Sequence, residues 1–392
     1  MNTDAPTSIA DQVEAQIDRS QWRSFKFSDL AENINEKISP KNSDLTHYIG
    51  LEHLDSGSLK IRRFGDPKAI KGDKLKIYKG DLIFAKRNAY LKRVSIAEFD
   101  AIASAHSMVL RARPENVIPE FLPFFLLSDT FWERAISISV GSLSPTINWK
   151  ALAKQEFLLP PKDQQAKLAE LLWAADKAVE RAIATHMTCE TTFRALEKKC
   201  FDHQGKVHEK LLNIATVKRG KFSHRPRNEP RFYGGDIPFI QTSEVVDSQK
   251  FIQEYSQTLN EEGLKISKMF PKGTIVMTIA ANIGYVGILD FDSAFTDSLV
   301  GVWANEEKVL QEYLFYYLNY NQPVLDRLAP ESAQKNLSID TMDSFDVYFP
   351  EKKINQSQII EKLDLVLDSI KTAANKVKSS QQLLKSLINQ IF

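Results

Sequence analysis

The sequence has little cysteine and no long apolar run. Only Cys189 and Cys200 occur among 392 residues, which argues against a disulfide framework and favours a reducing compartment. The segment 1–20 carries scattered acids without an apolar core, so we expect no signal peptide there. No later run has the length and apolar character that a membrane span requires. We therefore expect a cytoplasmic protein that has no membrane partner.

Local signatures of catalysis are also missing. The sequence contains no glycine-rich phosphate-binding loop and no Asn-Pro-Pro-aromatic motif of an amino-methyltransferase. His186 and Cys189 have the spacing of metal ligands, but no second pair follows them. We predict no catalytic residue, no metal ligand and no cofactor in this chain. A nuclease or methyltransferase whose active site is assembled only in space remains an alternative.

The chain has almost no net charge, at +1, but its basic residues are clustered. The window 60–93 holds twelve Lys and Arg residues against three acids, and the window 218–231 holds six against one. Basic clusters within a nearly neutral chain favour a phosphate-binding face. A solvated, lysine-rich surface is the alternative interpretation of the same pattern.

The main feature of the sequence is an internal repeat. A constant shift in residue number makes Leu168 correspond to Ile359 and Leu172 to Leu363. Mostly apolar or small residues recur at alternating steps of four and three in two segments. The first set is Leu168, Leu172, Ala175, Val179, Ala182, His186, Cys189, Phe193, Leu196 and Cys200. The second set is Ile359, Leu363, Val366, Ile370, Ala373, Val377, Ser380, Leu384, Leu387 and Ile391. This alternation is the apolar seam of a helix that packs against a partner helix.

Neither segment contains glycine or proline within the seam, so each predicts one continuous helix about 50 Å long. The simplest arrangement packs the two helices against each other as an antiparallel coiled coil. The repeat also continues upstream of each helix. Residues 47–57, 79–96, 115–131 and 141–161 parallel 238–248, 272–289, 306–322 and 331–351.

We predict an α/β (α+β) chain in which two globular domains are separated by the two long helices, in a pseudo-twofold repeat. The predicted segments are an N-terminal extension 1–20, a domain 21–161, a helix 162–204, a domain 205–351 and a helix 352–392. The aromatic residues Phe124, Phe125, Phe315, Tyr316 and Tyr317 lie at helical spacing, which favours the core of each domain.

Each domain meets its helix at a proline joint, "LLPPKDQQAKLAELL" in the first half and "YFPEKKINQSQIIEKL" in the second. Proline removes a backbone donor and fixes φ, so the preceding strand ends there, and helix N-termini tolerate it. Asp163 is the predicted N-cap of the first helix, where its carboxylate would suit the helix dipole.

Two further stretches belong with these joints: the "GSLSPTI" loop at 141–147 and the segment "RGKFSHRPRNEPRFYGGDIPFIQTSEV" at 219–245. Together, these features resemble the specificity subunit of type I restriction-modification systems. The resemblance covers nearly the whole chain from about Trp22. It implies a non-catalytic subunit that binds double-stranded DNA, with each domain a target-recognition domain for one half of a split target. It implies two methylation subunits and restriction subunits as partners, which would use S-adenosylmethionine, ATP and magnesium.

The sequence also departs from the family pattern. The usual Glu-Gln after the prolines is replaced by Gln164-Gln165 and Asn355-Gln356, and the second joint has one extra residue before Gln356. Residues 20–48 lack the "FYGGD" block of 232–236. The two half-sites are therefore expected to differ, which makes the full target asymmetric.

We predict that DNA is contacted by side chains able to match base edges or phosphates. These side chains lie on loops of the two basic clusters and on the loops that parallel them. In the first domain they are Lys86, Arg87, Asn88, Tyr90, Lys92, Arg93, Ser142 and Ser144. In the second domain they are Lys221, Ser223, Arg225, Arg227, Arg231, Thr242, Ser243, Asn282, Gln334, Lys335 and Asn336. The alternative function is a coiled-coil scaffold whose globular halves bind proteins, and charge reversal at Arg225 and Arg227 distinguishes the two.

Overall fold

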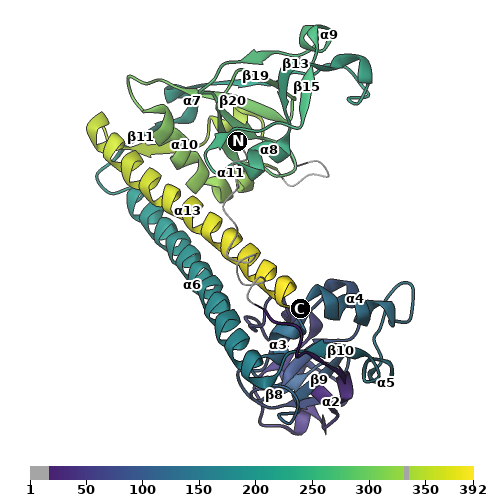
Figure 1. Cartoon of the computed structure of the whole chain (residues 1–392). Coiled ribbons are helices and arrows are strands. Elements are labelled where there is room, and N and C mark those ends of the chain that lie inside the picture. The colour runs from purple at the N-terminus through teal and green to yellow at the C-terminus, as the bar shows by residue number, and fades with distance from the viewer. Residues whose placement is uncertain (1–16, 331–334) are drawn as a thin grey trace, which may run out of the picture. The chain divides into compact units, whose positions relative to one another are not determined.

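The structure is a computed structural model that describes residues 17–330 and 335–392, and it divides into two compact units. Unit 1 comprises Met1–His186 and Ala373–Phe392, and unit 2 comprises Met187–Thr372. Two long helices, α6 (Lys162–Cys200) and α13 (Lys353–Ile391), each contribute residues to both units (Figure 1). Most of the predicted N-terminal extension, residues 1–16, lies outside the described residues.

The described residues of unit 1 form three small sheets and four short α-helices beside the long helices. A two-stranded sheet pairs β1 (Arg23–Lys26) with β10 (Glu156–Leu159). A second sheet has the order β2 (Ala31–Ile34), β9 (Ser107–Ala112), β6 (Leu82–Ala85), β7 (Val94–Ile96). A third has the order β3 (Lys37–Ile38), β5 (Lys74–Ile77), β8 (Ala101–Ala103), β4 (Tyr48–Ile49). The helices are α2 (Phe27–Leu30), α3 (Leu122–Phe125), α4 (Asp129–Ser137) and α5 (Trp149–Leu152).

The core of unit 1 forms where β6 meets α3 and α4. Every residue of β6 is buried, as expected for a continuous apolar strand covered on both faces. Trp132 of α4 stacks on Phe84 of β6, with ring centroids 5.1 Å apart. Phe124 and Phe125 are also buried in this core. This cluster continues onto the two long helices, and a second buried cluster includes Ile83 and Ala85 of β6.

Unit 2 has a similar plan, with one more strand in its larger sheet. β11 (Val207–Lys210) pairs with β21 (Asp346–Phe349). One sheet has the order β12 (Ala215–Arg219), β20 (Leu299–Ala304), β17 (Ile275–Thr278), β18 (Val286–Leu289), β14 (Phe251–Ile252). The other has the order β15 (Gln257–Leu259), β13 (Tyr233–Ile240), β19 (Ser293–Phe295), β16 (Met269–Phe270). Its helices are α7 (Leu211–Ile214), α8 (Thr242–Asp247), α9 (Glu261–Lys265), α10 (Gln311–Tyr320), α11 (Gln322–Leu328) and α12 (Ile339–Met342).

The aromatic residues predicted for the core of unit 2, Phe315, Tyr316 and Tyr317, are buried on α10. Tyr313 and Tyr317 keep their hydroxyls satisfied by donating to the backbone oxygens of Tyr348, at 2.9 Å, and Asp346, at 3.1 Å. These bonds attach α10 to β21, the strand that leads into α13.

The two units share much of their strand pairing but differ in the number of strands and in the length of one stretch. In unit 2 this stretch runs from the start of β12 at Ala215 to the end of β13 at Ile240. Its counterpart in unit 1, from the start of β2 at Ala31 to the end of β4 at Ile49, is shorter. The longer stretch contains the basic segment 219–231, so the difference includes the loop that the sequence marks as a binding candidate.

The seam residues of the two long helices face the interior of each unit. In unit 1, Leu168, Leu172 and Val179 of α6 share a hydrophobic cluster with Leu384 and Leu387 of α13. In unit 2, the end of α6 and the start of α13 share a second cluster, to which Phe193, Leu196, Ile359 and Leu363 belong. The pairing of opposite ends in each unit makes the two helices antiparallel. All twenty positions of the repeat frame are buried or half-buried.

The start of the first long helix differs from the prediction. α6 begins at Lys162, so Asp163 lies within the first turn and is not its N-cap. The second proline of the joint, Pro161, already precedes the helix and leaves no room for an N-cap at Asp163. The Asp163 carboxylate is still near the positive end of the helix dipole. Among the helices of the described residues, none has the length and apolar character needed to cross a membrane.

Candidate nucleic-acid interface

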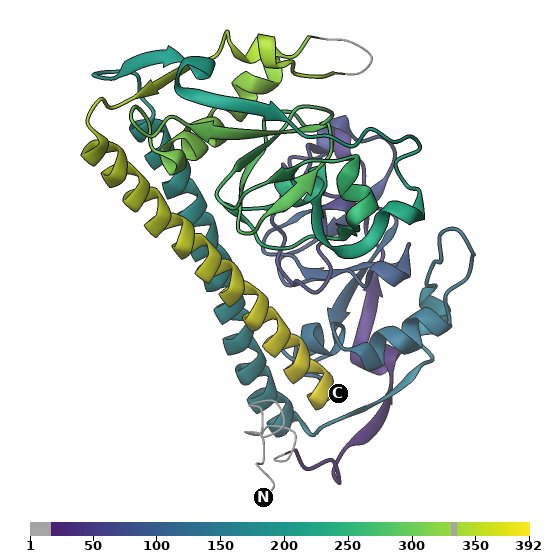
Figure 2. The same ribbon diagram turned by 90° about the horizontal axis from the view of Figure 1, so that it is seen from above.

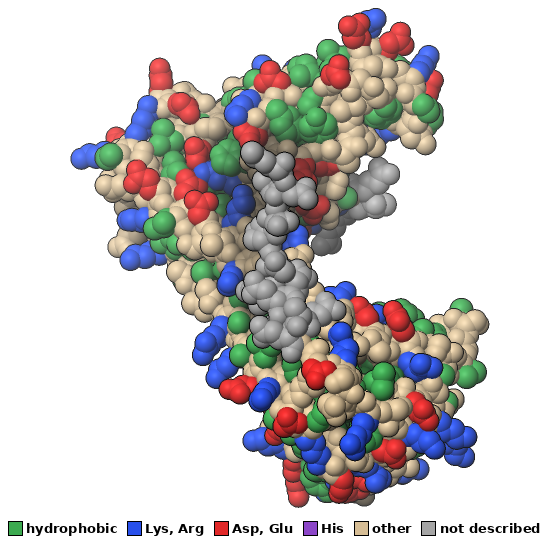
Figure 3. Space-filling model, viewed as in Figure 1, with side chains coloured by type: hydrophobic (Ala, Val, Ile, Leu, Met, Phe, Trp, Pro, Cys, Tyr) green, Lys and Arg blue, Asp and Glu red, His purple; other side chains and the backbone are tan. Residues whose placement is uncertain are grey.

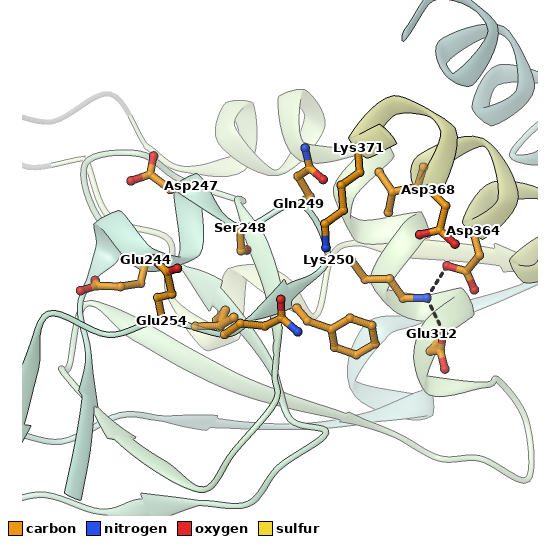
Figure 4. Close-up of a pocket in the computed structure, with 14 residues that line it drawn as sticks. Glu244, Asp247, Ser248, Gln249, Lys250, Glu254, Glu312, Asp364, Asp368 and Lys371 are labelled. Atoms are coloured by element: carbon orange, nitrogen blue, oxygen red, sulfur yellow. Dashed lines mark hydrogen bonds and ion pairs between the residues drawn. The ribbon is translucent and has the colours of Figure 1, made fainter. Parts of the chain in front are cut away.

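A pocket of about 700 Å³ in unit 2, beside α13, has the wrong charge for nucleic acid (Figure 4). Six carboxylates line it against two lysines: Glu244, Asp247, Glu254, Glu312, Asp364 and Asp368 against Lys250 and Lys371. The Nζ of Lys250, which is only 7% exposed, forms ion pairs with Glu312 and Asp364, as Figure 4 shows. Lys250 therefore links the β14 segment to α10 and α13, and the candidate interface must lie elsewhere.

In unit 1 the structure brings together two loops that the sequence separates. The turn after β6, residues 86–93, contacts the loop 140–146, which follows α4. Arg87 Nε donates to Ser144 Oγ at 2.8 Å, and the Ser144 hydroxyl donates to Asn88 Oδ1 at 2.6 Å. The backbone N–H of Ile147 donates to the oxygen of Lys86 at 2.8 Å. The turn 86–93 and the loop 140–146 therefore meet, and together they form the turn–loop surface of unit 1.

This surface lies in a positive electrostatic environment. The pKa of His106 is held below its usual range by burial and, additionally, by the charges of Arg87 and Lys86. Burial also lowers the pKa of the Lys86 ammonium. A cationic field of this kind is what a polyanion would encounter at the turn.

Two of the predicted contacts in this turn are engaged inside the protein. Lys92 Nζ pairs with Asp129 at 2.7 Å, and Arg93 Nη1 donates to the backbone oxygen of Leu51 at 2.7 Å. Arg87 and Tyr90 are exposed by comparison, and so is Ser142 in the loop. Contacts between DNA and Lys92 or Arg93 stay a prediction, as do the other contacts of this list.

The basic window of unit 1 does not form a uniform basic patch. On the face shown in Figure 3, Lys and Arg side chains alternate with acids over unit 1. The third sheet's neighbourhood illustrates this, since Arg62 and Arg63 pair with Asp55 and Lys76 pairs with Glu36. Part of the excess charge in 60–93 is therefore neutralised locally.

In unit 2 the arginines of the segment 219–231 converge on one carboxylate. Arg225 Nη2 contacts Asp297 Oδ2 at 2.9 Å, and Arg227 Nη2 pairs with the other oxygen, Oδ1. Arg219 Nε donates to the backbone oxygen of Asp297 at 2.6 Å. Both paired side chains remain about half exposed, although Arg225 Nη1 also donates to the backbone oxygens of Phe222 and His224.

The other predicted residues of unit 2 are mostly exposed loop residues. Lys221, Ser223 and Arg231 lie on the basic segment, Ser243 is exposed at the start of α8, and Thr242 beside it is half-buried. Asn336 forms a β-bridge with Ala280, which places the loop before α12 next to the turn that holds Asn282. Lys335 pairs with Asp326 at 2.8 Å. Gln334 lies outside the described residues.

The turn and loop of unit 2 repeat the arrangement in unit 1. The backbone N–H of Leu337 donates to Ile279 at 2.8 Å, which matches the bond from Ile147 to Lys86. Exposed guanidinium forks beside hydroxyl and amide groups can donate to phosphate oxygens and to guanine edges. Among the described residues, no three His, Cys, Asp or Glu side chains gather into a group that could hold a metal.

The sequence did not indicate the structural roles of three residues. Asp297 is one acid among many and lies 72 residues from Arg225, so no local pattern marks it. Leu143 is an exposed apolar residue in a polar loop, a signal that was visible in "GSLSPTI". Gln165 was noticed only as part of the joint, although it is fully buried and hydrogen-bonded.

Comparison with known proteins agrees with this arrangement. The model of the type I restriction modification DNA specificity domain matches the chain twice, over residues 19–186 and 209–384. The HindI specificity subunit of Haemophilus influenzae is 20% identical, over 86% of this chain and 91% of its own. The putative MjaX specificity subunit of Methanocaldococcus jannaschii is 22% identical, over 94% of this chain and 92% of its own.

Solved structures show the same fold. The crystal structure of a type I restriction-modification S subunit from M. genitalium matches with a TM-score of 0.61 and 13% identity, over 97% of this chain and 98% of that one. A chain from a structural study of assembly and conformational transition in the type I R-M system matches with a TM-score of 0.58 and 18% identity, over 95% and 99%. The matched regions include both units. The chain therefore belongs to the type I restriction-modification DNA specificity family, and its role is that of a specificity subunit, which recognises DNA and is not itself the enzyme.

Proposed function

We propose that the chain reads a bipartite, gapped DNA target, one half with each unit. The turn–loop surface of unit 1 would contact one half-site, and the segment 219–231 with the neighbouring 280–283 turn of unit 2 would contact the other. The observation that carries this proposal is the repetition: two matches to one DNA specificity domain, each with an equivalent turn and loop in contact.

The two half-sites differ in this proposal. The additional residues of unit 2 fall in the stretch that carries Arg225 and Arg227, and unit 1 has no counterpart of these arginines in its shorter stretch. Different donors would select different base edges. The full target is therefore asymmetric.

The long helices support the gap between the half-sites. Each has 39 residues, which corresponds to about 58 Å. This exceeds the roughly 34 Å of one DNA turn, so such helices are long enough to serve as a spacer between two half-site readers. Once one unit has bound its half-site, a fixed spacer raises the effective concentration of the other unit at the second half-site. Two short recognition sites then act as one longer target.

The same helices would bind the partner subunits. Ile354 and Leu365 on α13 are exposed large apolar residues on a helix whose other face is packed, which suits protein docking. Two methylation subunits would bind there and supply adenine methylation with S-adenosylmethionine, and restriction subunits would use ATP and magnesium. This chain would supply the position on DNA at which they act.

Mapping methylated adenines in the genome of a host that carries the complete system tests the proposal. The expected result is methylation at one asymmetric sequence made of two short parts with a fixed gap. Substitution of Arg225 by Glu should impair recognition of one part and leave the other part unchanged. Methylation without sequence preference, or a continuous target with no gap, would contradict the proposal.

A further inference from the structure

Leu143 is the most exposed large apolar side chain of the described residues, at 97%. It lies in the loop 140–146, which leaves the body of unit 1 directly after α4 (Figures 1 and 2). An isolated exposed leucine is ordinary on a protein surface. The loop that carries Leu143, however, is attached to the protein by specific hydrogen bonds.

The loop is fixed by backbone bonds across its base. Val140 and Thr146 exchange two hydrogen bonds, of 3.0 and 2.9 Å, and this isolated β-bridge closes the base of the loop. Gly141 has a φ of 106°, a conformation that favours glycine, and it turns the chain at the start of the tip. The loop therefore has a closed base and a short tip, and Leu143 belongs to that tip.

Of the two serines beside Leu143, Ser142 is exposed and Ser144 is bound to the protein. The Ser144 hydroxyl is held between Arg87 and Asn88, and the Thr146 hydroxyl donates to the Ser144 backbone oxygen at 3.0 Å. The two Ser144 hydroxyl bonds join the loop to the basic turn 86–93. Leu143 thus projects from a loop that is attached to cationic groups, which favours a polyanion as the occupant.

DNA offers one apolar group that such a tip can reach. The major groove is wide enough for a two-stranded ribbon, and the C5-methyl group of thymine lies there. Leucine cannot donate or accept hydrogen bonds, so it can discriminate bases only through this kind of apolar contact.

We propose that Leu143 contacts a thymine methyl group in the half-site read by unit 1 and is a specificity-determining residue there. The inference rests on the proposed function. Arg87 and Ser144 act as positioning residues for the tip, since their hydrogen bond fixes the loop against the basic turn.

A four-way binding experiment tests the contact. The wild-type chain and Leu143→Ala, each in the complex in which the chain binds its mapped target, are measured on duplexes that contain thymine or deoxyuridine at each thymine position. Deoxyuridine keeps base pairing and lacks only the methyl group. At one position of the unit 1 half-site, the wild type should lose about fourfold in affinity, the effect of one buried methyl group. Leu143→Ala should show no loss there.

Leu158→Ala is the matched control, because Leu158 is also exposed, at 62%, in unit 1 but belongs to β10. It should behave like the wild type on every duplex. An equal deoxyuridine effect in the wild type and in Leu143→Ala would overturn the inference. So would unchanged DNA selectivity with a loss of partner assembly, which would make Leu143 a protein contact.

The two levels of the argument fail differently. If the wild type showed no sequence preference on any duplex, the proposed function itself would fail. If the wild type kept a gapped preference that Leu143→Ala shared in full, only the role of Leu143 would be wrong.

Discussion

Gln165 and Gln356, which occupy equivalent positions of the internal repeat, make the same three hydrogen bonds in the two units. Gln165 Oε1 accepts from the backbone N–H of Ile118 at 2.8 Å, and its Nε2 donates to the oxygens of Pro160 and Asn116. Gln356 Oε1 accepts from Leu310, also at 2.8 Å, and its Nε2 donates to Pro350 and Lys308. Both side chains are buried.

This pair explains the joints between domain and helix. Each glutamine ties the first turn of a long helix to the proline that ends the preceding strand and to a loop of the domain. The extra residue of the second joint does not disturb the pattern, because both glutamines lie three residues after the first residue of their helix. The additional residue is accommodated before α13 begins.

Gln165→Ala should lower the free energy of unfolding of unit 1 by about 3 kcal/mol, since it leaves a buried donor and buried acceptors without partners. Gln356→Ala should do the same to unit 2. Hydrogen exchange separates the units: peptides that contain Ile118 should exchange faster in the first variant, and peptides that contain Leu310 in the second. Gln358→Ala, at an exposed position of α13, should change neither.

Val179→Asp should destabilise unit 1 by more than about 3 kcal/mol, because it places an unpaired carboxylate in the cluster that α6 shares with α13. Ala178→Asp makes the same change at the exposed neighbouring position and should have little effect. Denaturant unfolding of both variants provides the measurement. Equal midpoints would show that the helix packing in unit 1 is wrongly assigned.

Glu197 should make unit 2 less stable as the pH rises. Burial raises the pKa of this α6 carboxyl group from 4.5 to about 7. Between these values the unfolded chain has released the proton and the folded chain retains it, so stability falls with pH over that window and is constant above it. The total loss is on the order of 3 kcal/mol.

Glu197→Gln should remove this pH dependence and stabilise unit 2 at pH 8 relative to the wild type. Denaturant unfolding at pH 5 and pH 8 measures both quantities. Glu361→Gln, at an exposed position of α13, is the control and should keep the slope of the wild type. If the wild type instead became more stable from pH 5 to pH 8 as Glu197 ionised, the raised pKa of Glu197 would be wrong.

Reversal of charge at Arg225 and Arg227 separates DNA recognition from a scaffold role. The double change to Glu should weaken DNA binding at least about 100-fold and reduce the salt-dependence slope by about two, if each arginine contacts one phosphate. Lys198→Glu with Lys199→Glu makes the same change in net charge at exposed positions of α6. A scaffold would retain its protein partners and show no difference between the two double variants on DNA.

Asp297→Asn should reduce the discrimination between target and non-target DNA about tenfold while leaving non-specific affinity equal or higher. The carboxylate holds Arg225 and Arg227 in place, but it also neutralises part of their charge. Positioning and charge therefore act in opposite directions on the two kinds of binding. Binding to specific and random duplexes measures the ratio, with Asp236→Asn, at an exposed position of β13, as the control.

Restored discrimination in Asp297→Glu would support the positioning role, since this variant keeps the carboxylate. Equal losses of specific and non-specific binding in Asp297→Asn would instead indicate that the loop is merely less stable.

The helices and the repeat could be predicted well because their patterns are local. Val179 and Ile370 are marked as seam residues by neighbours three and four positions away, and both are buried in the structure. The loops were predicted less completely. Ser144 is a good candidate for DNA by residue type, yet its hydroxyl is engaged by Arg87, 57 residues away. Periodicity carries no information about such a distant partner.

The order of residues was enough to establish that the chain is two similar halves, each a mixed α/β domain followed by a long helix with one apolar seam. It also established that the basic segments differ between the halves. The folded chain determined which acidic residues pair with which basic residues and which loops meet. Asp297 faces Arg225 and Arg227, and Lys250 is buried between Glu312 and Asp364, because folding brings distant segments together. Hydrophobic periodicity acts over one or two helical turns, whereas the pairing of charges and loops depends on the path of the whole chain.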